Sequence, residues 1–333
     1  MKTLHLPALY LLFALLFHQS SIAQRSNWTN ITTPYYLYAF AESKQSYWFA
    51  HSGGLFEVDK TTFQTKPHLP YNSNIKGCKT TGVVVNDQDE VFISTEYGGI
   101  YKYNGSDWTQ VQSQQIKDYH KFPTSSLKID RNNNLWFIGN EFKNQWNYAI
   151  FQIKAGKDQI VQHKFTIDGL SCIEVDRNAQ VWAANRQSIY RFGEDKVEEA
   201  LDISKIKVEE SEGVRGLYFD SKNILYINTI YSTKDHFTGF RIIKYSNGEF
   251  SELWNSRSLE SGFKYSSIYM HNDSFYLHTY KGMTSYLSII SEGKISKIPR
   301  ENIGLSQSQY LFTIIGVDMQ KNFVYQTYDT LKK

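Results

Sequence analysis

The chain repeats one short pattern seven times. In its clearest copy, "IDRNNNLWFIGN" (129–140), a polar turn signal runs directly into an apolar segment that carries Trp136. The aspartate six residues before this aromatic anchor is typical of a tight turn, because its side chain bonds to the N–H groups of the turn. The seven anchors are Trp48, Phe92, Trp136, Trp182, Tyr226, Tyr276 and Val324. Their intervals of 44, 44, 46, 44, 50 and 48 residues indicate a repeat architecture.

Each repeat predicts four short antiparallel strands. An apolar segment such as "GVVV" precedes the turn, the anchor strand follows it, and a third strand such as "GIYKY" comes next. A more polar segment such as "DWTQV" often closes the unit. This is the length and content of a β-propeller blade. Such a sheet cannot bury both faces alone, so we expect an all-β, seven-bladed propeller of four-stranded antiparallel blades over residues 24–333.

The two ends of the chain predict how the ring closes. The last repeat provides an inner strand near 313–318 and a second strand near 322–327, and little sequence follows. The segment "SNWTNI" (26–31) resembles the outer-strand segment "SDWTQV" of the second repeat. We therefore expect the N-terminal strand to complete the last blade and remove its free edge. Six blades with an odd end are the alternative.

The N-terminus predicts export. Lys2 precedes an apolar stretch from Leu6 to Phe17, and small residues follow up to Ala23, which together indicate a cleaved signal peptide over residues 1–23. Twelve apolar residues are too few for a bilayer, which needs about 20. We expect a secreted or periplasmic chain that starts at Gln24 and has no membrane span.

Composition argues against nucleic acid as a partner. The 36 basic and 33 acidic residues are interspersed and give a net charge of only +3. The two cysteines, Cys78 and Cys172, are too few for a disulfide framework. Two buried thiols are the favoured interpretation, and one disulfide remains open. We expect a monomer.

The repeat resembles the two-component regulator propeller repeat. The matching segments are "VFISTEYGGIYKYNGSDW" (91–108) and "VWAANRQSIYRF" (181–192), beside the opening segment 129–140. The resemblance implies a seven-bladed propeller like the periplasmic sensor regions of bacterial hybrid histidine kinases, which detect sugars or oligosaccharides. This chain shows no transmembrane helix, Y_Y_Y-type module or kinase, so the resemblance implies a stand-alone propeller. A looser resemblance is to the streptogramin-type lyases.

Known catalytic and metal motifs are absent from the sequence. It has no Gly-rich phosphate loop, no His-Glu-x-x-His, no Gly-x-Ser-x-Gly and no paired-cysteine metal motif. The Asp-x-Asn turns contain the oxygen ligands that calcium prefers, but hairpin turn chemistry explains them better. We therefore predict no cofactor and no metal site.

The candidate binding residues lie in loops between second and third strands, which we expect to converge at the channel mouth. Two of these loops are enlarged, "NEFKNQWN" (140–147) and "IYSTKDHFTG" (230–239). Aromatic and charged loop residues suit ligand binding. The candidates are His51, Tyr97, Trp146, Arg186, Tyr231, His236, Tyr280 and Lys281.

The function hypothesis is noncatalytic binding of a glycan or an extracytoplasmic protein partner through these loops. The rival is a polysaccharide or lactone lyase, in which His51 or His236 pairs with Glu96 or Glu141 at the channel mouth. A third reading, a structural role in a surface assembly, predicts an exposed apolar patch on the outer rim.

Overall fold

The computed structural model describes residues 36–329 except 78, 97–98, 112–123, 141–146, 158, 194–195, 208, 234–237, 260–262, 282–283, 292, 300–308 and 321–322. The predicted signal peptide (1–23) and the predicted N-terminal strand (26–31) lie outside the described residues.

Six antiparallel sheets of four strands follow one another along the chain, and a two-stranded sheet comes last. The first three sheets contain β1 (Leu37–Glu42), β2 (Ser46–His51), β3 (Gly54–Asp59), β4 (Thr65–His68); β5 (Thr80–Val85), β6 (Val91–Thr95), β7 (Gly99–Tyr103), β8 (Trp108–Gln110); and β9 (Thr124–Ile129), β10 (Leu135–Asn140), β11 (Asn147–Ile153), β12 (Ile160–Asp168). The next three contain β13 (Cys172–Val175), β14 (Val181–Ala184), β15 (Ser188–Phe192), β16 (Val197–Asp202); β17 (Gly213–Phe219), β18 (Leu225–Ser232), β19 (Thr238–Ser246), β20 (Glu249–Asn255); and β21 (Phe263–His271), β22 (Ser274–Lys281), β23 (Thr284–Ser291), β24 (Lys294–Ile298). The last sheet pairs β25 (Gln309–Val317) with β26 (Phe323–Asp329).

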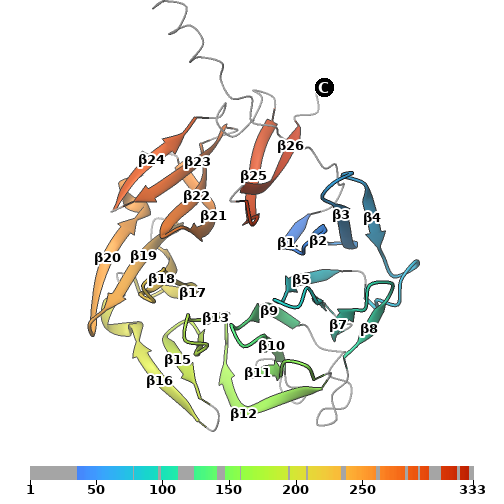
Figure 1. Cartoon of the computed structure of the whole chain (residues 1–333). Helices are drawn as coiled ribbons and strands as arrows, with labels where there is room; N and C mark the ends of the chain where they lie inside the picture. The colour runs from blue at the N-terminus through green and yellow to red at the C-terminus, as the bar shows by residue number, and fades with distance from the viewer. Residues whose placement is uncertain are drawn as a thin grey trace, which may run out of the picture.

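The sheets stand around a central axis as the blades of a propeller (Figure 1). The first strand of every blade lies innermost and the fourth lies on the perimeter, with neighbours paired in sequence order. The β25–β26 sheet fills the remaining position, where β25 contacts both β21 and β1. The all-β propeller of four-stranded blades is thus confirmed. The count is corrected: six blades have four strands among the described residues, rather than the predicted seven.

The hydrophobic core lies between neighbouring blades. One cluster joins the first two blades and includes Trp48 and Trp108, and another joins the second and third and includes Phe92 and Phe137. Every residue of the second strand β6 is buried, whereas the outer strand β24 is largely exposed. A strand covered on both faces requires continuous burial, and an edge strand tolerates polar side chains. The aromatic residues therefore fill the space between blades, as the repeat predicts.

The aspartates of the repeat are structural. Asp130 Oδ1 accepts the backbone N–H groups of Asn132 and Asn134 at 2.9 Å each. Its Oδ2 accepts the indole N–H of Trp136 at 2.9 Å, so one buried carboxylate ties the turn to the anchor. The equivalent pairs are Asp176 with Trp182 and Asp220 with Tyr226. These turns are scaffold, as the sequence pattern predicts.

The same turns also link neighbouring blades through a series of hydrogen bonds, here called the turn ring. In each, the backbone N–H of one turn donates to a side-chain oxygen in the turn of the next blade. The pairs are Lys44 to Asp89 (2.8 Å), Asp87 to Asn133 (3.0 Å), Arg177 to Asn223 (2.9 Å) and Ser221 to Asp273 (2.7 Å). All four acceptors have a left-handed backbone, with φ between 59° and 68°, which asparagine and aspartate tolerate best. The fourth blade has Ala179 at this position (φ 62°). Because alanine has no side-chain oxygen, the backbone N–H of Arg131 lacks the corresponding acceptor.

The first blade departs from the pattern by one residue. Its indole Trp48 Nε1 donates to Ser43 Oγ at 3.1 Å, so Ser43 replaces the turn aspartate rather than Glu42, which the repeat alignment places there. Glu42 instead pairs with Lys60 and accepts the backbone N–H of Met319, which joins the last sheet to the first. The glutamate therefore stabilises the point where the ring closes.

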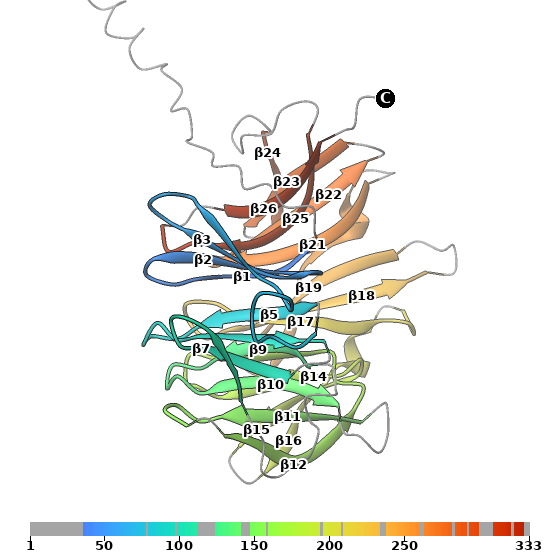
Figure 2. The ribbon, with the colours of Figure 1, turned by 90° about the vertical axis from the view of Figure 1, so that its right-hand side faces the viewer.

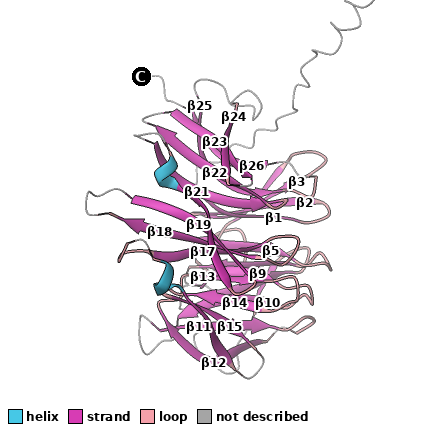
Figure 3. Cartoon of the chain, turned by 90° about the vertical axis from the view of Figure 1, so that its left-hand side faces the viewer, coloured by secondary structure: helices cyan, strands magenta, loops and turns pink. Residues whose placement is uncertain are grey.

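Helical structure is confined to two short 3₁₀ turns in the described residues, η3 (Ile203–Ile206) and η4 (Ser256–Ser258) (Figure 3). No helix in the described part of the chain is long and apolar enough to cross a membrane. Both 3₁₀ turns follow an outer strand and lead toward the inner strand of the next blade.

Candidate functional site

The two faces of the propeller differ in the loops that they carry. The turn face carries the aspartate turns between first and second strands, and the loop face carries the connections between second and third strands. Among the strands that point toward the loop face, β18 and β19 are long, with eight and nine residues (Figure 2). Three predicted site residues, Tyr97, Trp146 and His236, lie outside the described residues. The other five belong to the loop-face ends of the first, fourth, fifth and sixth blades.

Two of the five come together around one turn of the chain. This 209–212 turn connects η3 to β17, between the fourth and fifth blades, and is closed by the Glu212 N–H donating to Glu209 O at 3.0 Å. From one side, exposed Arg186 donates through Nη2 to Ser211 O at 2.9 Å. From the other side, the Ser211 hydroxyl donates to Ser232 O, directly after Tyr231, at 2.8 Å. The turn thus connects Arg186 and Tyr231, which stand on different blades.

Tyr231 supports this surface from below. Its side chain is only 1% exposed, and its hydroxyl donates to Asn255 Oδ1 at 2.8 Å. The Arg257 guanidinium lies over its ring, 5.3 Å from the centroid, and pairs with Glu209 at 2.6 Å. The ring face is therefore covered by Arg257. It is this half-exposed guanidinium, rather than the tyrosine ring, that faces solvent.

A buried ion cluster fixes the end of the 209–212 turn. Glu212 is 1% exposed. Its two carboxylate oxygens both accept hydrogen bonds from Arg241 Nη1, at 3.0 and 3.1 Å. Arg241 also donates through Nε to Glu252 at 2.6 Å and through Nη1 to Ile206 O at 2.9 Å. Thr229 adds a hydroxyl donor to Glu212. A buried carboxylate needs such partners, and removing them would leave an uncompensated charge.

The remaining loop-face candidates lie farther along or in the interior. Tyr280 and Lys281 end β22, where Tyr280 is partly buried and Lys281 is exposed. His51 ends β2 and is fully buried, with its ring stacked on Phe56 at 4.2 Å between centroids. Its Nδ1 accepts the Gly53 N–H at 2.9 Å, and burial lowers the pKa of His51 to about 4. His51 is therefore neutral at pH 7 and presents no surface to a large ligand.

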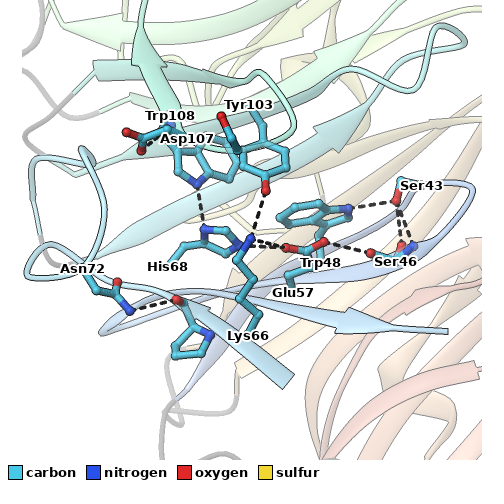
Figure 4. A network of polar contacts seen from close by, with 12 residues as sticks. Ser43, Ser46, Trp48, Glu57, Lys66, His68, Asn72, Tyr103, Asp107 and Trp108 are labelled. Atoms are coloured by element: carbon cyan, nitrogen blue, oxygen red, sulfur yellow. Dashed lines mark hydrogen bonds and ion pairs between the residues drawn. The ribbon is translucent and has the colours of Figure 1, made fainter. Parts of the chain in front are cut away.

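A histidine–carboxylate pair is present, but on the outer rim rather than at the channel mouth (Figure 4). His68 Nε2 lies 2.9 Å from Glu57 Oε2, between β3 and β4 of the first blade. Trp108 Nε1 donates to His68 Nδ1 at 3.0 Å, so the proton of the neutral ring is on Nε2 and is donated to Glu57.

This rim cluster is enclosed by the first two blades. Trp48 and Trp108 pack edge to face at 6.0 Å, and both are 2% exposed, as His68 is buried beside them. Burial raises the pKa of Glu57, but hydrogen bonds from His68 and Ser46 outweigh this and leave it below its ordinary value. The hydrogen bond between Trp108 and His68 therefore joins the first two blades, and the buried histidine ring packs against both indoles.

Metal and thiol chemistry find little support in the described residues. Within them, no group of three histidine, cysteine or acidic side chains is placed to hold a metal ion. Cys172 begins β13 as a free thiol, and burial raises its pKa to about 12. Cys78 lies outside the described residues.

Sequence reasoning missed Glu209, Ser211 and Arg257. They lie between blades, on the segment before β17 and in η4, where the repeat pattern has no conserved spacing to align. A usable signal is present: the acidic "EESEG" (209–213) falls one blade before the arginine of "NSRS" (255–258). Their contact depends on the connections between blades, which the repeat period does not specify.

Comparisons with known proteins place the fold. No family model matches the sequence, and no curated protein matches it. Among solved structures, the chain is similar to the extracellular domain of BT4673 from B. thetaiotaomicron, assigned to a hybrid two-component system, with 11% identity and a TM-score of 0.51 over 85% of this chain and 48% of that one. YCF48 bound to D1 peptide matches with 12% identity and a TM-score of 0.55, over 76% of this chain and 78% of that one.

A third similar structure is PorZ, a bacterial surface component of the type-IX secretion system of Porphyromonas gingivalis. It matches with 11% identity and a TM-score of 0.53, over 90% of this chain and 47% of that one. The chain spans about half the length of BT4673 and PorZ. At these identities the similarity shows the propeller fold.

Proposed function

We propose that the chain is a noncatalytic binding propeller that recognises a glycan or protein partner at the extracytoplasmic surface. The observation that carries this is the surface around the 209–212 turn, where Arg186 is held by Ser211 O and Arg257 by Glu209 while both arginines remain exposed. A guanidinium that is already oriented loses little entropy on binding and presents several donors. Carboxylates and hydroxyl groups on a partner are its natural acceptors.

The comparisons are compatible with a binding role outside the cytoplasm. An extracellular domain and a peptide-bound propeller share the fold. The predicted signal peptide over residues 1–23 agrees with that location and remains a prediction. The predicted N-terminal strand over residues 26–31 likewise remains our proposal for how the seventh sheet gains its outer strand.

The lyase alternative receives no comparable support. It expects a histidine and an acid at the channel mouth, whereas the pair formed by His68 and Glu57 is enclosed at the rim. His51 is buried against Phe56. His236 lies outside the described residues.

The test is a screen of the purified chain against glycan and peptide libraries, followed by variants. Arg186→Met should weaken binding of the best ligand about tenfold or more, because a hydrogen bond to a charged group contributes about 1.5–3 kcal/mol. Arg131→Met is the matched control, since Arg131 is an exposed arginine on the turn face. Lys281→Met, at the loop-face end of β22, and Trp146→Ala, in the predicted loop 140–147, extend the test.

Two outcomes would contradict the proposal. The first is that no library member binds. The second is that Arg186→Met, Lys281→Met and Trp146→Ala all bind as tightly as Arg131→Met, which would move the interaction away from the loop face.

A further inference from the structure

The turn face contains a hollow that the proposed function does not use. It has a volume of about 400 Å³ and lies where the turns of the fourth, fifth and sixth blades meet. Its lining residues are Arg177, Phe219, Ser221, Met270, His271, Asn272 and Asp273. This volume falls within the range of small-molecule sites.

A fixed guanidinium lines the hollow. Arg177 Nε donates to Asp220 O at 2.8 Å, and the Arg177 backbone N–H belongs to the turn ring through Asn223. Both the backbone and the start of the guanidinium are therefore held. Within the described residues the two terminal nitrogens of Arg177 have no hydrogen-bond acceptor. Their N–H groups can bind a carboxylate in the bidentate manner that arginine favours.

A fixed carboxylate also lines the hollow. Asp273 accepts the backbone N–H of Ser221 at 2.7 Å through Oδ1 and the Ser221 hydroxyl through Oδ2. These hydrogen bonds hold the pKa of Asp273 below its ordinary value, and the one from the Ser221 hydroxyl has the larger effect. The carboxyl group is therefore ionised at neutral pH. Each oxygen retains a lone pair for a further donor.

The two charges face the same hollow without pairing. Among the described residues, neither Arg177 nor Asp273 takes part in a salt bridge, although Arg177 is near enough to lower the pKa of Asp273. Phe219 and Met270 add partly buried apolar side chains to the lining. A hollow lined by a cation, an anion and some apolar surface is complementary to a molecule that carries an acid and a hydrogen-bond donor on a compact body.

We propose that this turn-face hollow binds a small carboxylic acid that also carries a hydrogen-bond donor, of the size of one sugar acid or one amino acid. The carboxylate binds the terminal nitrogens of Arg177. A hydroxyl or ammonium group of the ligand donates to Asp273. The site is distinct from the loop-face surface. An experiment can therefore refute one of the two proposals and leave the other standing.

Isothermal titration calorimetry tests the site with three probes: D-glucuronate, L-threonine and the neutral methyl glucoside. At least one acid should bind saturably at up to millimolar concentration, and methyl glucoside should not. Arg177→Met should weaken that binding about ten- to hundredfold, and Arg177→Lys should weaken it less, because lysine keeps the charge but not the fork. Lys154→Met, which removes an exposed positive charge of the third blade that does not line the hollow, should leave the affinity unchanged.

The Asp273 carboxylate distinguishes an amino acid from a sugar acid as the ligand. Asp273→Asn keeps an oxygen for the Ser221 N–H but removes the negative charge, so it should abolish threonine binding and weaken glucuronate binding only a few fold. Asp89→Asn, at the equivalent position of the second blade, is the control. The proposal is overturned if neither acid binds, or if Arg177→Met loses no more affinity than Lys154→Met.

Discussion

Replacing Ala179 with asparagine should stabilise the protein, because it would supply the acceptor that the turn ring lacks. Arg177 N and Asn223 Oδ1 are 2.9 Å apart in the next step of the ring, and Ala179 has nearly the same φ as Asn223. One added hydrogen bond contributes about 0.5–1.5 kcal/mol. The several-fold preference of asparagine over alanine for left-handed backbone adds about 0.5–1 kcal/mol. Together these predict about 1–2.5 kcal/mol of added stability.

The assay is equilibrium urea unfolding of the full chain, followed by tryptophan fluorescence. Ala179→Asn should raise the unfolding midpoint, and Asn223→Ala should lower it by a similar amount. Ala179→Gly relieves the backbone without adding an acceptor, so it should gain less than asparagine. Ala155→Asn, an exposed alanine that lacks a left-handed backbone, controls for composition. If Ala179→Asn is no more stable than Ala155→Asn, the turn ring does not contribute to stability as described.

Three further predictions concern buried titratable groups. Glu212→Gln should cost about 3 kcal/mol in urea unfolding, because Arg241 would keep a buried charge without its main partner; a loss under 1 kcal/mol would contradict this. His51 has a folded pKa of about 4, below its unfolded value near 6.5, so its contribution is full above pH 6.5 and is lost as the pH falls toward 4. That loss amounts to about 3 kcal/mol, and His51→Gln should flatten the pH dependence of stability in this window. Cys172, with a pKa of about 12, should resist iodoacetamide at pH 8 in a folded Cys78→Ser background and react after unfolding; rapid labelling of the folded chain would contradict the raised pKa.

The scaffold was predictable because its constraints are local and repeated. Asp130 and Trp136 are six residues apart in one hairpin, so the same hydrogen bond recurs in other blades and leaves a visible column in the sequence. The first blade shows the limit of this reasoning. Ser43 performs the same task from a position one residue later, and only the contact with Trp48 reveals the shift.

The candidate site was predictable only in part, because it is formed by segments that the period does not align. Arg186 and Tyr231 were identified from their loops, but the tyrosine ring is covered by Arg257 instead of facing solvent. Arg257 belongs to η4, in the connection between the fifth and sixth blades. His51 looked like a loop residue, yet its position at the end of β2 buries it. Burial at a strand end depends on packing against β3, which hydrophobic patterning does not resolve.

The turn-face hollow shows the same limit. Arg177 and Asp273 are separated by two blades in sequence, and each reads as an ordinary turn residue. They line the same hollow because the turns of successive blades lie side by side around the ring. Sequence reasoning assigned the whole face to scaffold, which is correct for Asp176 and Asp220 but incomplete for their neighbours.

If partners bind on the loop face around the 209–212 turn, that region should be shielded from solvent in the complex. Hydrogen–deuterium exchange of the chain with and without the best ligand from the library screen measures this shielding. Exchange should become slower at residues 185–188, 209–213 and 230–233, with little change in the aspartate turns. Protection confined to the aspartate turns at 86–90, 130–134 and 176–180, with none at the 209–212 turn, would contradict it.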